Sequence, residues 1–201
     1  MSFTSLITSS GYTTGYLIIF LIIFAESGLF FGFFFPGDSL LITLGILASQ
    51  GHFNVLTILG IGIIGSILGN SVGYSFGKRF GPSLFNRKDS FFLKKDNIKK
   101  AHEFYKQYGK AAIILARFTP IVRTFAPIIA GMGDMEYTTF MLYNVIGGIL
   151  WVNSVTLIGY FLGSRFPFIE KNITTLTISI VIISILPYVY HLLKERTKKH
   201  S

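Results

Sequence analysis

The chain is too apolar to be an ordinary soluble protein. Of its 201 residues, 51% are hydrophobic, 13% are charged and 21 are glycines, whereas about a quarter of the residues in a soluble domain are charged. The mean hydropathy is +0.59. Too few polar side chains remain to cover a soluble surface. This composition excludes a disordered chain, a nucleic-acid-binding domain and an ordinary cytosolic enzyme, and it predicts a polytopic membrane protein.

The formal net charge of +9 is gathered at two places. Ten of the 18 basic residues fall within 78–110, and four more lie between 194 and the C-terminus. Both clusters follow apolar runs, which is typical of cytoplasmic loops that face anionic lipid headgroups. No basic residue precedes the first apolar stretch, so a cleaved signal peptide is not expected. The absence of cysteine excludes a disulfide framework, a thiol nucleophile and a cysteine-based metal site.

Three charge-free stretches are long enough to cross a membrane, which takes about 20 apolar residues. They are residues 55–77, 138–163 and 172–193. With both basic clusters inside, the first runs inward, the second outward and the third inward again. The C-terminus is then cytoplasmic.

Two further apolar stretches are interrupted by proline. Residues 16–35 lead into Pro36-Gly37-Asp38 and then a short apolar arm, and residues 111–133 contain Pro120 and Pro127. The second arm of the first stretch has about ten residues, about 15 Å of helix, which reaches only half-way across. We therefore predict two re-entrant hairpins, broken at Pro36, Gly37, Pro120 and Pro127. In the alternative, 16–35 is an ordinary span and 111–133 is one kinked span.

An internal repeat favours the hairpins. The pattern G-Y-x-x-G-x-R-F occurs at 73–80 and again at 159–166. Because the two predicted spans that carry it run in opposite directions, the repeat is inverted, as in many secondary transporters. The predicted fold is therefore an all-α membrane protein with one membrane domain over 1–201. Its parts are a first hairpin and span at 16–81, a linker at 82–110, a second hairpin and span at 111–166, an extra span at 172–193 and a basic tail at 194–201.

The linker at 82–110 differs from the rest in kind. Aromatic and aliphatic side chains recur at helical spacing between its lysines. This pattern predicts a basic amphipathic helix on the cytoplasmic membrane surface. The alternative is a plain solvated loop.

Two acids stand inside apolar sequence, Glu26 and Asp38. A charge within the bilayer costs several kcal/mol, so such a residue is a functional candidate by default. The alternatives are that each acid only pairs with an arginine to hold the fold, or that Glu26 lies at the interface.

The second predicted hairpin supplies the opposite charges. Arg117 and Arg123 flank Pro120, which disfavours helix at Thr119 and favours the start of a new helix. The free N–H groups of that helix start and the two guanidinium groups together predict an anion site, with phosphate suited to arginine.

These motifs resemble the DedA family, also called the SNARE-associated or VTT-domain family. They are Glu26 with F-x-P-G-D at 34–38, G-N-S-x-G-Y-x-x-G-x-R-F-G at 69–81, and R-F-T-P-I-V-R-T-F-A-P-x-x-A-G at 117–131. The resemblance covers roughly 16–166 and implies lipid translocation in the bacterial cytoplasmic membrane. It implies undecaprenyl phosphate or a related phospholipid as substrate, coupled to the proton-motive force. Carried over by motif, the required acids are Glu26 and Asp38, and the required arginines are Arg117 and Arg123.

Coupling would follow from an exchange of partners. A lipid phosphate that engages Arg117 and Arg123 leaves the acids without their cations, so an acid takes up a proton. Glu26 and Asp38 are thus the expected proton-coupling pair, and Arg117 and Arg123 the expected phosphate-binding pair. Membrane lipid and protons are the expected partners.

The sequence lacks the signatures of several other functions. The four histidines are isolated, no carboxylate cluster suits Mg²⁺, and no nucleotide-binding loop occurs, so we expect no enzyme activity, no cofactor, no metal and no use of ATP. A proton- or Na⁺-coupled transporter of ions or small molecules and a passive phospholipid scramblase remain alternatives, whereas a structural membrane protein would not need four charges inside the membrane. The lipid headgroup, the transport direction and association into a homo-oligomer are left open.

Overall fold

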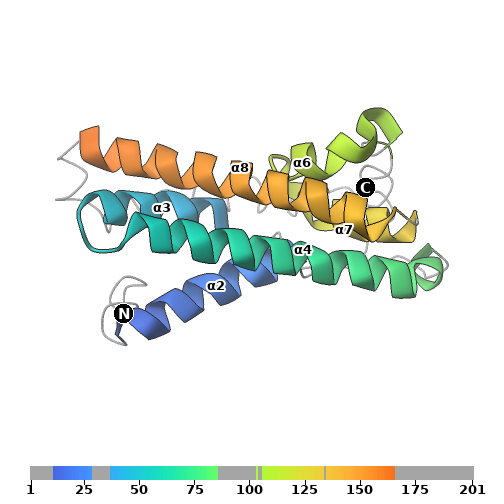
Figure 1. Ribbon diagram of the computed structural model, residues 1–201, viewed down its shortest axis with the longest axis horizontal. Helices are drawn as coiled ribbons and strands as arrows, with labels where there is room; N and C mark the ends of the chain where they lie inside the picture. Colours follow the sequence, from blue (N-terminus) through green and yellow to red (C-terminus); the bar gives the residue numbers. More distant parts are fainter. Residues whose placement is uncertain (1–10, 29–36, 86–102, 104–105, 134, 166–201) are drawn as a thin grey trace, which may run out of the picture.

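The computed structural model describes residues 11–28, 37–85, 103, 106–133 and 135–165, and all regular structure in these residues is helical. Figure 1 shows the helices along the chain. In order they are α2 (Tyr12–Gly28), α3 (Gly37–Ser49), α4 (Val55–Phe85), the short 3-10 helix η2 (Gly109–Ala111), α6 (Ala112–Ala116), α7 (Pro120–Met132) and α8 (Tyr137–Arg165).

Two long helices form the frame. Within the described residues, Val55–Phe80 and Tyr137–Arg165 are long and apolar enough to cross a membrane, which confirms the predicted helices at 55–77 and 138–163. α4 and α8 lie side by side and run in opposite directions (Figure 1). With 31 and 29 residues, they measure about 46 and 44 Å, more than the roughly 30 Å of hydrocarbon. α4 continues to Phe85, so the predicted linker at 82 begins inside this helix.

The shorter helices occupy opposite ends of this frame. α2 runs from one end to the middle of α4, where a side chain on Gly69 would meet the Phe24 carbonyl and the Gly28 amide. α3 begins near the middle and returns to the same end, whereas α6 and α7 lie at the other end (Figure 1). The ends of several short helices therefore meet near the middle of the two long ones.

The packing of the short helices is crossed between the two halves of the chain. α3 packs along α8, where a Cβ on Gly45 would overlap the carbonyl of Thr156. α7 packs along α4, where a Cβ on Gly131 would overlap the carbonyl of Tyr74. Small residues let helix backbones approach this closely. Each half therefore lays a short helix on the long helix of the other half.

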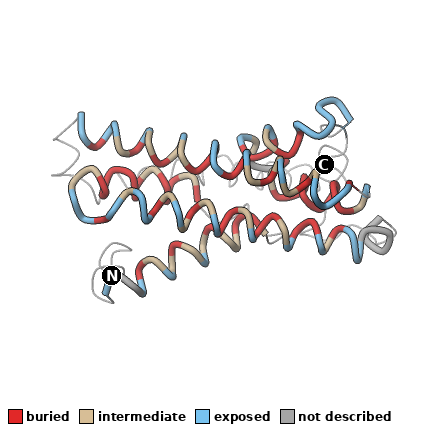
Figure 2. The backbone as a smooth tube through the Cα atoms, viewed as in Figure 1, coloured by how far each residue is buried: buried red, intermediate tan, exposed pale blue. Residues whose placement is uncertain are grey.

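Apolar side chains fill both ends. One buried cluster joins α2, α3, α4 and α8 and includes Leu41 and Val152; the other surrounds Phe125 and Phe140 at the α6–α7 end. Buried positions face the interior in Figure 2, and exposed positions line the outer faces. Large apolar side chains such as Leu56 are exposed there, as suits helix faces that contact lipid.

The predicted break at Pro127 is wrong. α7 continues through this residue from Pro120 to Met132. Proline removes one N–H donor from a helix, but Pro127 is buried and its ring faces α4, close to Gly73. Packing against α4 therefore holds the helix on both sides of the missing hydrogen bond.

Several predictions lie outside the described residues. They concern Pro36, most of the linker at 82–110, the span at 172–193 and the tail at 194–201. Gly37 is described, and it is the first residue of α3.

Candidate functional site

The predicted break at Pro120 is confirmed and shapes the site. Thr119 has an extended backbone (φ −122°, ψ 105°), and Pro120 starts α7. α6 ends just before Arg117, and Arg123 lies in the first turn of α7. The break therefore lets two arginines six positions apart reach the same central region from two short helices.

Arg123 joins the two halves of the chain through ion pairs. Its Nη1 donates to Asp38 Oδ2 at 2.9 Å, and its Nη2 pairs with Glu26 Oε1. Both acids come from the first half, Glu26 from the end of α2 and Asp38 from the start of α3. Arg123 thus forms the acid–arginine pairs that the sequence led us to expect, whereas no described acid pairs with Arg117.

The two acids have unequal surroundings. The Glu26 side chain is 1% exposed, whereas that of Asp38 is 42% exposed. Glu26 also packs directly on Gly37, where any side chain would collide with its Oε2. Because Asp38 is partly exposed whereas Glu26 is enclosed by protein, the ionised form of Glu26 depends more strongly on its cation.

Trp151 of α8 contacts both Asp38 and Arg123. Its indole N–H donates to Asp38 Oδ1 at 2.9 Å, and its ring centroid lies 5.5 Å from the Arg123 Cζ. A guanidinium near an aromatic ring gains a cation–π attraction. Trp151 thus fixes Asp38 and Arg123 together against the middle of α8.

Arg117 has a different kind of partner. It is 4% exposed, and its Nη2 donates to Asn144 Oδ1 at 2.6 Å and to the Asn144 carbonyl at 3.3 Å. Its Nε has no hydrogen-bond partner. Among the described residues, no carboxylate lies within ion-pair distance of Arg117. A buried cation that only neutral acceptors contact is incompletely compensated, which makes Arg117 suited to an anionic ligand.

Two buried asparagines hold Arg117 in place. Asn144 Nδ2 donates to the Ile67 carbonyl at 3.1 Å, which ties α8 to α4. The side-chain amide of Asn70, on α4, lies 3.1 Å from Asn144 Oδ1. When the Asn70 amide nitrogen faces the Ser27 carbonyl, the Asn70 amide oxygen accepts a hydrogen bond from Arg117 Nη2 at 3.0 Å. Gly147 leaves the space in which the Arg117 side chain lies against α8. We call Asn70 and Asn144 the amide cradle.

Sequence reasoning did not assign a role to the amide cradle or to Trp151. A signal for Asn70 and Asn144 was present, because a polar amide within a charge-free span normally needs a hydrogen-bond partner. Trp151 is the single tryptophan of the chain, but its residue type alone does not indicate that it contacts an acid.

The site contains two arginines and two acids, and the two arginines have different partners. Arg117 can accept an anion without breaking an ion pair, and Arg123 can do so by exchanging a carboxylate. Among the described residues, no three His, Asp or Glu side chains form a group that could hold a metal ion.

Comparisons with known proteins identify the family. The VTT domain matches residues 35–161. The chain is 44% identical over 183 residues to Protein DedA of Escherichia coli (strain K12), covering 90% of this chain and 83% of that protein. It is 43% identical over 175 residues to an uncharacterized membrane protein of Mycobacterium tuberculosis (strain ATCC 25618 / H37Rv), covering 84% and 74%. It is 32% identical over 155 residues to the inner membrane protein YqjA of E. coli (strain K12), covering 77% and 70%.

No solved structure matches the chain. The VTT domain spans more than half of the chain, and a relative that is 44% identical matches 90% of its length. Two of these relatives are named as membrane proteins, in agreement with the two membrane-length helices. The chain is a member of the DedA family of membrane proteins.

Proposed function

We propose that this protein is a lipid translocase that moves undecaprenyl phosphate or a related phospholipid across the bacterial cytoplasmic membrane. The observation that supports this most is the buried Arg117, which has only neutral partners among the described residues, beside the Arg123 ion pairs. A lipid phosphate supplies the missing negative charge and suits the planar guanidinium group. The lipid is moved and not chemically changed.

The arrangement of the helices supports a transporter architecture. The charged groups gather near the middle of α4 and α8, where the short helices end. Broken helices that meet at the membrane midplane are typical of transporters with inverted repeats. The crossed packing of α3 on α8 and α7 on α4 supports the proposed inverted repeat, and the return of α3 to the end from which α2 comes supports a re-entrant hairpin.

The proposed cycle exchanges one set of ion pairs for another. The phosphate binds Arg117 and then Arg123, and this separates Arg123 from Glu26 and Asp38. A carboxylate without its cation takes up a proton, so a proton gradient can set the direction of transport. Proton coupling is thus assigned to Glu26 and Asp38.

A flip assay in proteoliposomes tests the function. Phosphatidylcholine liposomes that contain undecaprenyl phosphate are prepared with wild type, Arg117→Lys and Arg117→Ala, and the lipid moved is measured with and without an imposed pH gradient. Lysine keeps the charge but loses the fork of donors, so both variants should flip lipid more slowly.

Arg165→Lys is the matched control, because Arg165 is exposed at the end of α8. It should flip lipid at the wild-type rate. Full activity of both Arg117 variants at normal expression would overturn the phosphate role. Wild-type flipping that ignores the gradient would indicate a passive scramblase, and ion movement without lipid movement would indicate an ion-coupled transporter.

The proposed topology is a multi-pass protein with residues 82–110 and 194–201 in the cytoplasm and 166–171 outside. Cysteine labelling from each side checks this arrangement, because the natural chain contains no cysteine. Labelling of 82–110 and the C-terminus from opposite sides would overturn the inverted topology.

A further inference from the structure

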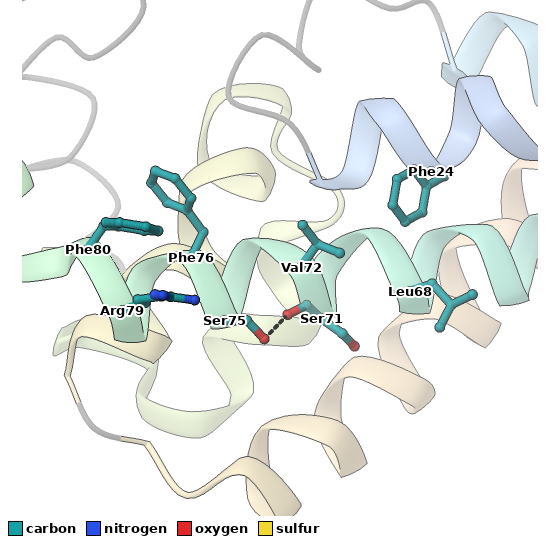
Figure 3. A pocket seen from close by; sticks show the side chains of 8 residues that line it. All are labelled: Phe24, Leu68, Ser71, Val72, Ser75, Phe76, Arg79 and Phe80. Carbon is teal, nitrogen blue, oxygen red and sulfur yellow. Dashed lines mark hydrogen bonds between the residues drawn. The ribbon is translucent and has the colours of Figure 1, made fainter.

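An open groove of about 500 Å³ runs along the outer face of α4, away from the ion pairs. Its apolar walls come from Leu68, Val72, Phe76 and Phe80 of α4 and from Phe24 of α2 (Figure 3). Leu68, Val72 and Phe80 are each more than two-fifths exposed. From residue 68 to residue 80 the groove extends along about 18 Å of helix, slightly more than half the hydrocarbon thickness.

A polar line runs through this apolar groove. Arg79, Ser75 and Ser71 are spaced four residues apart on α4, so they lie on one face. Figure 3 shows them in succession, with Ser75 Oγ donating to the Ser71 carbonyl at 2.8 Å. Arg79 is exposed, its Cζ lies 5.7 Å from the Phe80 ring centroid, and no described carboxylate lies within ion-pair distance of it. The groove therefore has, at one end, a cation that no described carboxylate neutralises, and apolar walls along its length.

The inner end of this line reaches the candidate site. Ser71 lines the groove, and its Oγ lies 3.5 Å from Asn144 Nδ2. Asn144 in turn accepts the hydrogen bond from Arg117. Ser71 and Asn144 thus link the inner end of the groove to the buried Arg117.

We propose that this groove is the entry site of the lipid, in which Arg79 binds the phosphate and the apolar walls hold the hydrocarbon chain. The inference rests on the proposed lipid translocation and adds the place from which the lipid reaches Arg117. Charge complementarity selects the occupant: a phosphate lipid satisfies both the cation and the apolar walls, whereas zwitterionic lipid brings its own cation to Arg79. The phosphate then passes Ser75 and Ser71 on its way to Arg117.

Site-specific photocrosslinking tests the groove. Benzoylphenylalanine replaces Leu68 in the full chain, which is reconstituted in phosphatidylcholine liposomes containing a small fraction of undecaprenyl phosphate. After irradiation, mass spectrometry gives the ratio of the two lipid adducts. The control probe replaces Ile158, an equally exposed residue on the outer face of α8. Val72 is the second groove position, in case the Leu68 variant does not fold.

The groove probe should capture undecaprenyl phosphate about fivefold above its share of the lipid, the factor that one arginine contributes to anionic lipid binding. The Ile158 probe should capture the lipids in proportion to their abundance. Arg79→Gln should remove the enrichment, whereas Lys78→Gln should keep it, because Lys78 has the same charge one residue away but does not line the groove.

Adducts at Leu68 and Val72 that follow the bulk composition would show an ordinary lipid-facing surface and overturn the proposal. Enrichment that persists in Arg79→Gln would overturn the role of Arg79. Flipping measured in the same liposomes separates this proposal from the function. Flipping at the wild-type rate without enrichment rejects only the groove, and enrichment without any flipping rejects only translocation.

Discussion

Replacing Arg123 with glutamine should destabilise the protein strongly. Arg123 is the cation of both Glu26 and Asp38. Without it, Glu26 at 1% exposure has no cation beside it, so it must either stay ionised at a high cost or take up a proton. Removing one partner of a buried ion pair costs about 3–5 kcal/mol, so we expect Arg123→Gln to lower the free energy of unfolding by this amount.

The two acids should contribute unequally to this loss of unfolding free energy. Asp38 is 42% exposed, so its pair with Arg123 is the less buried of the two and its share of the cost is smaller. Most of the loss should come from Glu26. The double variant Arg123→Gln with Glu26→Gln removes the stranded charge and should recover most of the stability. Arg123→Gln with Asp38→Asn should recover little.

Reversible unfolding in mixed detergent micelles, followed by far-UV circular dichroism, measures these free energies. Trp151 provides a local signal, because it is the single tryptophan of the chain and contacts both Arg123 and Asp38. A loss below about 1 kcal/mol for Arg123→Gln, within the range of exposed ion pairs, would refute the argument. Equal recovery by the two double variants would show that burial does not distinguish the acids.

Three other substitutions test the packing and the amide cradle. Gly45→Ala should lower the free energy of unfolding by about 1–3 kcal/mol, because the new Cβ would overlap a backbone carbonyl of α8. Gly60→Ala places its Cβ in open space and should be neutral or stabilising. Equal unfolding free energies for the two variants would contradict the packing of α3 on α8. Trp151→Phe removes the indole hydrogen bond and should cost about 1 kcal/mol in the same unfolding assay, and no measurable change would disagree with that bond. Asn144→Leu removes one side-chain acceptor of the buried Arg117 guanidinium and should slow lipid flipping. Asn153→Leu loses only a bond to its own helix and should not slow it; equal rates for the two variants would exclude Asn144 from transport.

The elements that sequence predicted well are those set by local composition. Residues 55–77 and 138–163 had to be helices of membrane length, because a charge-free run of this length satisfies its backbone only as a helix in lipid. Pro120 had to interrupt the chain, because it restricts the residue before it and starts a helix well. Ion pairs between these acids and an arginine were expected from the cost of isolated charges in a membrane, but the sequence did not indicate which arginine would form them.

The features that sequence did not predict depend on contacts between distant segments. The glycine at position 45 indicates a close approach, but not that its neighbour is Thr156 in the other half of the chain. Pro127 looked like a break because a proline usually interrupts a helix, yet packing on α4 keeps α7 continuous. Asn144 became the partner of Arg117 only through the way α6 lies against α8.

The different partners of the two arginines imply an order of events on the proposed mechanism. A phosphate that binds Arg117 displaces only hydrogen bonds to the neutral side chains and backbone of the amide cradle, so this step breaks no ion pair. Binding to Arg123 must displace two carboxylates, and the half-exposed Asp38 separates at lower cost than the buried Glu26. Asp38 also keeps its hydrogen bond from Trp151 after it leaves Arg123. The phosphate therefore engages Arg117 first and replaces Asp38 next, and the separation of Arg123 from Glu26 is the costly last step, at which uptake of a proton by Glu26 lowers the energy most.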